Sequence, residues 1–213
     1  MSGTGGRGTG RRRLLAATGA ATLGAITGCL SLLDGGGYRV RLGADADWRP
    51  LTPVETGSTH RNVYCGGEED SCETARHGLD RADTVSMFVH RHADGDGPEH
   101  ALVVTYDTPD DSGGTATLQL DETISVEEDL IVADGPVENS GSNADSYESD
   151  RFVHNWADDY TDGAVIALDA LSTPTLEFGE TEGLAEVLVF SGTDPESAGS
   201  YGAAVDTPVS FEF

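Results

Sequence analysis

The chain has 213 residues with 38 acidic and 12 basic side chains, which gives a formal net charge of −26 at pH 7, and every basic side chain is an arginine. Phosphate binding requires a basic surface, so this composition argues against nucleic acid as a partner. The lack of lysine also excludes a P-loop nucleotide site and lysine Schiff-base chemistry.

The first 28 residues have the three parts of an export signal in their usual order. A glycine-rich start with four arginines, among them Arg11 and Arg12, precedes an apolar run of 13 residues from Leu14 to Ile26. A helix needs about 20 residues to cross a bilayer. The run is therefore too short for a permanent membrane span, and we expect residues 1–28 to be cleaved from the mature protein.

Two motifs in this leader resemble known export motifs. Residues 11–15 (RRRLL) resemble the twin-arginine motif, and residues 26–29 (ITGC) resemble a lipobox. Together they resemble the leaders of exported lipoproteins of halophilic archaea, and the resemblance covers the leader alone. It implies that the export machinery reads Arg11 and Arg12, that Cys29 carries a lipid, and that the domain lies outside the cell, anchored to the outer face of the cytoplasmic membrane.

The acidity of the mature chain fits a salt-rich environment. Removing residues 1–28 deletes four arginines and no acid, so eight basic and 38 acidic residues remain and the net charge becomes −30. Such a charge opposes compaction at ordinary ionic strength. At about 1 M salt the Debye length falls to about 3 Å, and most of this repulsion is screened. We therefore expect a halophilic, acidic surface on a folded protein.

A lipidated cysteine and short glycine-rich tether over residues 29–38 should lead into a single domain over residues 39–213, a length that suits one core. Within it, Cys65 and Cys72 can close a short disulfide loop in an extracellular protein. The loop-entropy model gives this loop about 2.5 kcal/mol of stabilisation. Half of a metal site is the alternative, but the spacing matches zinc motifs poorly.

Short strands separated by glycine, proline and aspartate dominate the domain. We predict strands over residues 84–91, 100–106, 115–120, 129–132, 164–168, 175–178, 186–190 and 209–213. Residues 93–98 should form the turn of a hairpin, and residues 138–150 a long surface loop. This pattern predicts an all-β fold, an antiparallel β-sandwich or jelly-roll-like domain with at most one short helix.

Residues 150–162 hold the one helix-like segment. Phe152, Val153, Trp156 and Tyr160 follow helical spacing, and Gly163 would end the helix. However, the acidic residues near its end would oppose the helix dipole. A loop that packs Trp156 inward is the alternative.

The predicted hairpin contains the first candidate metal site. His90 and His92 are two residues apart and share a face of the strand, so both could bind one ion, with a carboxylate from the turn or Glu99 as a third ligand. His100 faces the other way if residue 92 pairs with residue 99. A polar hairpin tip in an acidic chain also looks like this without a metal.

The second candidate site is acidic. Asp134, Glu138 and Asp162 could converge on Ca²⁺, whose six to eight oxygen ligands suit irregular loops, with Trp156 and Tyr160 as an aromatic platform beside it. Calcium is the only cofactor that the sequence suggests. Ordinary acidic turns and a core tryptophan are the alternative explanation.

No catalytic motif accompanies these sites, since the chain has no nucleophile elbow, no zinc-protease helix and no dinucleotide fingerprint. The sequence does not favour an enzyme. It predicts a lipid-anchored extracellular module that binds an unknown ligand or protein or serves a structural role. The alternative is a metal-ion or solute-binding protein that uses the histidine hairpin or the acidic site.

Overall fold

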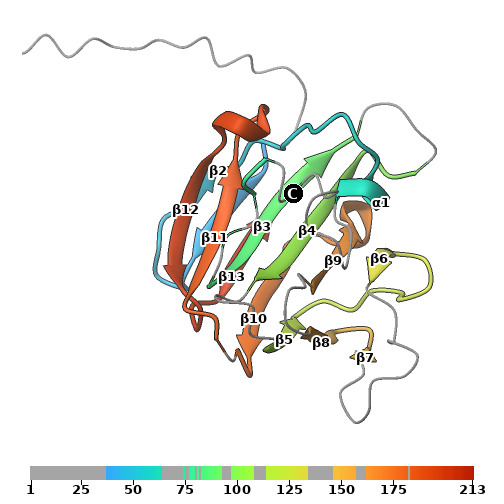
Figure 1. The fold of residues 1–213 in the computed structure, drawn as a ribbon, viewed down its shortest axis with the longest axis vertical. Helices are drawn as coiled ribbons and strands as arrows, with labels where there is room; N and C mark the ends of the chain where they lie inside the picture. Colours follow the sequence, from blue (N-terminus) through green and yellow to red (C-terminus); the bar gives the residue numbers. More distant parts are fainter. Residues whose placement is uncertain are drawn as a thin grey trace, which may run out of the picture. The chain divides into compact units, whose positions relative to one another are not determined.

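Two β-sheets packed face to face form the domain, which confirms the predicted all-β sandwich (Figure 1). The computed structural model describes residues 37–63, 74, 77–79, 81, 83–92, 97–107, 114–133, 146–156, 162–181 and 183–213. They belong to one compact unit that extends from Gly36 to Phe213. Among these described residues, no helix is both long and apolar enough to span a membrane.

The first sheet has seven strands and is antiparallel throughout. In spatial order its strands are β2 (Arg49–Pro50), β1 (Arg39–Leu42), β13 (Val209–Glu212), β10 (Thr175–Gly179), β5 (Gly114–Leu120), β8 (Arg151–Trp156) and β7 (Ser146–Tyr147). The first strand of the domain thus pairs with the last one.

The second sheet has six strands and is mixed, because β11 runs parallel to β3 while the other pairs are antiparallel. In spatial order its strands are β12 (Gly199–Ala204), β11 (Glu186–Ser191), β3 (Thr84–Arg91), β4 (His100–Asp107), β9 (Asp162–Ala167) and β6 (Leu130–Ala133). The described helices are α1 (His60–Val63) and the 3₁₀ turns η3 (Leu168–Ala170) and η4 (Pro195–Ser197).

The central strands of the six-stranded sheet, β11, β3, β4 and β9, are buried on both faces. The inner face of this sheet packs on the seven-stranded sheet through residues such as Met87, Val104 and Ile166. Val54, Val63 and Leu79 cover the outer face, where they pack on a second apolar cluster. The strand residues of this cluster are Phe88, Ala101, Val103, Val165, Leu188 and Phe190. Continuous burial explains why β3 and β4 read as unbroken apolar runs.

The eight predicted strands are all present, with ends that shift by two residues at most. The sequence reading missed β1, β2, β7 and β12, which are short or lie at sheet edges. Residues 146–147 and the turn that follows them fall inside the predicted long loop, and residues 138–145 lie outside the described part of the chain.

The predicted helix or loop over residues 150–162 is wrong, because Arg151–Trp156 is the strand β8. Phe152 and His154 are buried while Arg151, Val153 and Asn155 are partly exposed, which is the alternation of a strand. Residues four apart lie on one face of a strand as well as on one face of a helix. The spacing of Phe152 and Trp156 therefore could not distinguish the two structures.

Gly163 gives a direct test of how closely β9 packs on β4. A Cβ atom added at Gly163 would overlap the backbone carbonyl oxygen of Val104, whereas one added at Gly179 on β10 would meet nothing within 4 Å. Because backbone cannot move aside inside a paired sheet, we expect Gly163→Ala to lower the free energy of unfolding by about 2 kcal/mol or more. The matched control Gly179→Ala should change it by less than about 1 kcal/mol. Denaturant unfolding in high salt measures both, and equal effects would contradict this packing.

Candidate functional site

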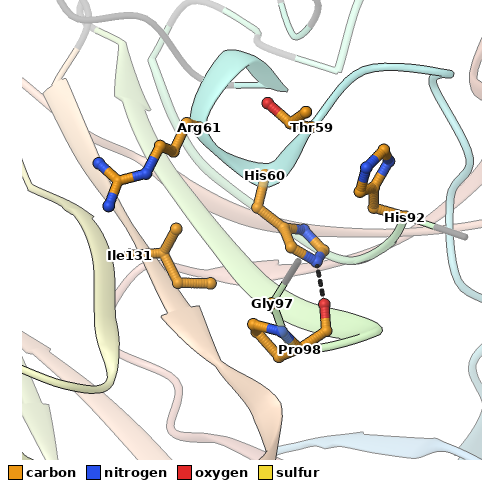
Figure 2. Close-up of a pocket in the computed structure, with 7 residues that line it drawn as sticks. All are labelled: Thr59, His60, Arg61, His92, Gly97, Pro98 and Ile131. Carbon is orange, nitrogen blue, oxygen red and sulfur yellow. Dashed lines mark hydrogen bonds between the residues drawn. The ribbon is translucent and has the colours of Figure 1, made fainter. Parts of the chain in front are cut away.

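A pocket of about 200 Å³ opens on the outer face of the six-stranded sheet, beside α1 (Figure 2). Seven described residues line it, and we call it the histidine pocket: Thr59, His60, Arg61, His92, Gly97, Pro98 and Ile131. None of these seven side chains is acidic. Figure 2 shows His92 and Arg61 on opposite sides of His60.

Backbone contacts with β3 place the helix that carries His60. β11 pairs with β3 only as far as Met87, and beyond this point Val54 takes over the free edge of β3. The Val54 N–H donates to the Val89 carbonyl at 2.8 Å, and the Arg91 N–H donates to the Val54 carbonyl at 2.9 Å. With Val54 and Val63 both buried against the sheet, His60 is held directly above His90.

Four residues from three separate segments form a continuous chain of hydrogen bonds, which we call the histidine chain. Thr56 Oγ1 lies 3.0 Å from His90 Nε2, His90 Nδ1 lies 2.8 Å from His60 Nδ1, and His60 Nε2 lies 2.8 Å from the Pro98 carbonyl oxygen. His90 is fully buried and His60 is 5% exposed. All four ring nitrogens therefore have partners inside the protein.

The direction of these hydrogen bonds follows from their last acceptor. The Pro98 carbonyl can only accept, so His60 Nε2 carries a hydrogen, and a neutral His60 then accepts at Nδ1. His90 must donate from Nδ1 and accept the Thr56 hydroxyl hydrogen at Nε2. Thr56 Oγ1 also accepts the Ser58 N–H at 3.2 Å. The chain of donors and acceptors is complete with both imidazoles neutral.

Burial keeps these two imidazoles neutral. Loss of solvent lowers the pKa of His90 to about 3, and positive charge on His60, His92 and His100 lowers it further in the same direction. Burial also lowers the pKa of His60, against the opposite effect of its hydrogen bond to Pro98. His60 and His90 thus serve as a fixed wall of the pocket rather than as titrating groups near neutral pH.

His92 differs from the other two histidines. Its Nε2 atom is buried and has no hydrogen-bond partner among the described residues, while its ring lies 5.9 Å from that of His60. An unsatisfied buried nitrogen is costly unless something binds it. His92 therefore gives the histidine pocket a buried polar atom that a ligand can bind.

The hairpin register separates the remaining candidates from His90 and His92. The His92 N–H donates to the Glu99 carbonyl at 3.0 Å, so residue 92 lies opposite residue 99, and the conditional prediction for His100 holds: its ring lies 5.2 Å from Tyr38. The Glu99 carboxylate lies 3.1 Å from Arg91 Nε, and the guanidinium group of Arg91 also binds Glu55. The predicted meeting of Glu99 with the two histidines is not present.

His90 and His92 lie in one cluster of histidines, but they are not a pair of free metal ligands, because both ring nitrogens of His90 already have hydrogen-bond partners. Among the described residues, no three histidine, cysteine or acidic side chains are arranged to hold a metal ion. Seven of the predicted site residues lie outside the described part of the chain: Arg11, Arg12, Cys29, Cys65, Cys72, Asp134 and Glu138.

Asp162, expected at an acidic turn, instead lies in the core at the start of β9. Its Oδ1 atom accepts the Gly163 N–H at 2.6 Å and lies 3.2 Å from His154 Nδ1 on β8. The side chains of His154 and Asp162 are 0% and 2% exposed, so the contact joins the two sheets through the middle of the sandwich. Within the part of the chain that the structure describes, His154 Nε2 and Asp162 Oδ2 are buried without hydrogen-bond partners.

Two tyrosines surround this buried pair. The Tyr106 ring lies 4.8 Å and the Tyr147 ring 5.5 Å from the His154 ring. Burial, and then the charge of Asp162, raise the pKa of Tyr106 well above its ordinary value of 10.0, so this phenol stays protonated. Sequence reasoning missed these contacts and the position of His60 above His90, because each contact joins residues from separate strands or segments.

Comparison with known proteins adds no relative to this description: no protein-family model, curated protein or solved structure matches the chain. The function must be argued from the site itself.

The buried His90 predicts a specific loss of stability in acid. In the unfolded chain a histidine binds a proton below a pKa of about 6.5, whereas folded His90 does so only near 3. Between these values the unfolded state holds the extra proton, so His90 makes the fold less stable as the pH falls, by about 2 kcal/mol between pH 6.5 and 4.5.

We expect His90→Phe to lower the free energy of unfolding at pH 7 by about 1–3 kcal/mol, because Thr56 and His60 lose their partner. The same variant should lose less stability than the wild type between pH 6.5 and 4.5. Denaturant unfolding at several pH values in high salt measures this difference, and His77→Gln, outside the histidine chain, is the control. A wild-type slope in the His90→Phe variant would contradict the assignment.

Proposed function

We propose that the protein is an exported, lipid-anchored β-sandwich that binds a small anionic solute in the histidine pocket. Two independent features support this proposal. The leader, with Arg11, Arg12 and the lipobox at Cys29, supports export and lipid attachment. The histidine pocket supports solute binding, and the buried, unpartnered Nε2 atom of His92 is the observation that carries this part.

The composition of the pocket favours an anion over a metal ion. In a chain with 38 acidic residues, the seven described lining residues include Arg61 and two histidines and no carboxylate. His60 and His90 have no free nitrogen to offer a metal, because their ring nitrogens bind each other, Thr56 and Pro98. A carboxylate or other oxyanion can instead accept a hydrogen bond from His92 and is attracted by the Arg61 guanidinium.

The histidine chain contributes rigidity rather than charge. A wall whose donors and acceptors are already paired does not rearrange when a solute enters, which lowers the cost of binding. Ile131 and the Pro98 ring add apolar surface to the same pocket. A small organic acid, with one oxyanion and a short apolar part, fits this combination of groups.

The pocket can be tested with acetate and inorganic phosphate as probes. In the wild-type protein, titration with either probe should shift the ¹⁵N resonances of the His92 ring. His92→Gln should weaken binding about tenfold, since it loses one charge-assisted hydrogen bond, and Arg61→Gln should weaken it less. His100→Gln, on the opposite face of the hairpin, is the matched control. The proposal fails if neither probe perturbs His92, and it is replaced by the metal-ion alternative if Zn²⁺ or Ca²⁺ binds there instead.

Lipid attachment is tested separately at Cys29. When the full gene is expressed in a halophilic archaeal host, the wild-type protein should partition into the detergent phase and carry a lipid at Cys29 by mass spectrometry. Cys29→Ser should move it to the aqueous phase, whereas Ser31→Ala beside it should have no effect. An intact N-terminus recovered from the cytosol, with an unmodified thiol at position 29, would overturn this part.

A further inference from the structure

The first hairpin of the domain has an unusual share of the positive charge. Three of the eight arginines that remain after residue 28 lie between Arg39 and Arg49, and residues 38–50 contain only two acids. The rest of the chain after residue 28 has five arginines and 36 acids, a net charge of −31. The segment that directly follows the tether is thus positive by one charge, in a protein that is otherwise strongly negative.

These arginines lie on aromatic rings at one edge of the sandwich. Arg39 and Arg41 lie on either side of the buried Val40 and so face outward, with their guanidinium carbons 5.6 and 4.9 Å from the centre of the Trp48 ring. We call the set of Arg39, Arg41, Trp48, Arg49 and Tyr201 the arginine–aromatic edge. Cation–π contact fixes these side chains, and Arg41, which is partly exposed, also donates from its guanidinium group to Ser210 Oγ at 3.3 Å. The guanidinium N–H groups that have no partner within the protein can bind an anion.

The same edge continues across to the second sheet. The Arg49 guanidinium lies 5.1 Å from the centre of the Tyr201 ring on β12, and the Tyr201 hydroxyl donates to the Pro50 carbonyl at 3.0 Å. Figure 1 shows β2 and β12 beside each other. Both sheets therefore contribute to one surface of arginine, tryptophan and tyrosine.

Part of this positive charge has a partner within the protein. Arg39 binds the Glu212 carboxylate on β13, and Asp45 and Asp47 are exposed in the loop between β1 and β2. Even so, the Arg39 side chain remains 47% exposed. Arg49 is exposed as well. The edge is close to neutral overall, which still separates it from the acidic remainder of the protein.

The tether places this edge near the membrane if Cys29 carries a lipid. Nine residue steps separate Cys29 from Tyr38 and span at most about 32 Å when extended. A domain of this length has an expected diameter of about 40 Å. The start of β1 therefore stays close to the attachment point, and the far side of the domain cannot be brought against the bilayer by the tether alone.

We infer that the arginine–aromatic edge docks on the phospholipid headgroups of the membrane to which Cys29 is attached, an inference that rests on the proposed lipid anchor. The three guanidinium groups match phosphate oxygens, and tryptophan and tyrosine favour the level of the headgroups. The remaining charge of −31 is repelled by anionic lipid, so docking holds the histidine pocket in a fixed orientation to the membrane. In high salt the long-range attraction is screened, but direct contacts with phosphate and the insertion of Trp48 persist.

Vesicle flotation of the unlipidated mature chain, residues 29–213 with Cys29→Ser, tests the edge without the anchor. It should bind phosphatidylglycerol vesicles and bind phosphatidylcholine vesicles more weakly. Combined Arg39→Gln, Arg41→Gln and Arg49→Gln should lower the partition coefficient on phosphatidylglycerol at least about tenfold at low salt. The matched control combines Arg81→Gln, Arg91→Gln and Arg151→Gln, which changes the net charge equally and should have a much smaller effect.

A second measurement follows Trp48 itself. In a Trp156→Phe background Trp48 is the only tryptophan, and lipids brominated near the headgroup should quench its fluorescence in both low and high salt. Absence of vesicle binding, equal loss in the control variant, or an unquenched Trp48 would each overturn the inference. Because these vesicle experiments use an unlipidated chain, failure of lipid attachment at Cys29 would appear only in the detergent-phase test.

Discussion

Burial of the central strands of the six-stranded sheet on both faces is the constraint from which the site follows. Val54, Val63 and Leu79 cover the outer face, so β3 and β4 have no solvent-exposed side over most of their length. Any polar side chain on these strands must find its partners inside the protein. His90 lies under this cover, and the histidine chain through Thr56 and His60 is the arrangement that satisfies it.

The fold accommodates its buried imidazoles in two different ways. His90 is paired with neutral groups and ends its chain of hydrogen bonds on the Pro98 carbonyl, so no charge is buried there. His154 lies between the sheets against the carboxylate of Asp162, and each side chain leaves one buried polar atom that no described residue binds. A fully satisfied network rigidifies its surroundings, whereas a partly satisfied one carries a cost in stability. Of the two networks, the fully satisfied and therefore more rigid histidine chain is the one that lies next to the histidine pocket.

Local sequence signals were sufficient for most of the strands. The runs over β3 and β4 are apolar enough to be recognised without alignment, and the sequence predicted that they form a hairpin. It left the register open, and the pairing of residue 92 with residue 99 in the structure is what turns His100 away from His92. The strand β8 was not recognised because Phe152 and Trp156 are four residues apart, a spacing that fits one face of a helix and one face of a strand alike. Sequence spacing could place His90 and His92 on one face, and in the structure both rings lie near His60.

The rest of the site depends on contacts that no local pattern records. His60 lies in a four-residue helix with no apolar periodicity, and it meets His90 only because Val54 occupies the edge of β3 that β11 leaves free. Glu99 was expected beside the histidines, but Arg91 provides a stronger attraction for its carboxylate. The strand β1 was missed because its exposed arginines conceal the single buried Val40, and these same arginines form the edge that we assign to the membrane.

The pairing of β1 with β13 sets the order in which the protein can be assembled. Arg39 lies opposite Glu212, so residues at the two extremes of the domain are neighbours in one ladder. During synthesis the ribosome releases β1 long before Val209–Glu212 exists, and until then β1 has only the two-residue strand β2 beside it. The nascent domain therefore has an unpaired edge at β1, which can pair only after Val209–Glu212 has been made.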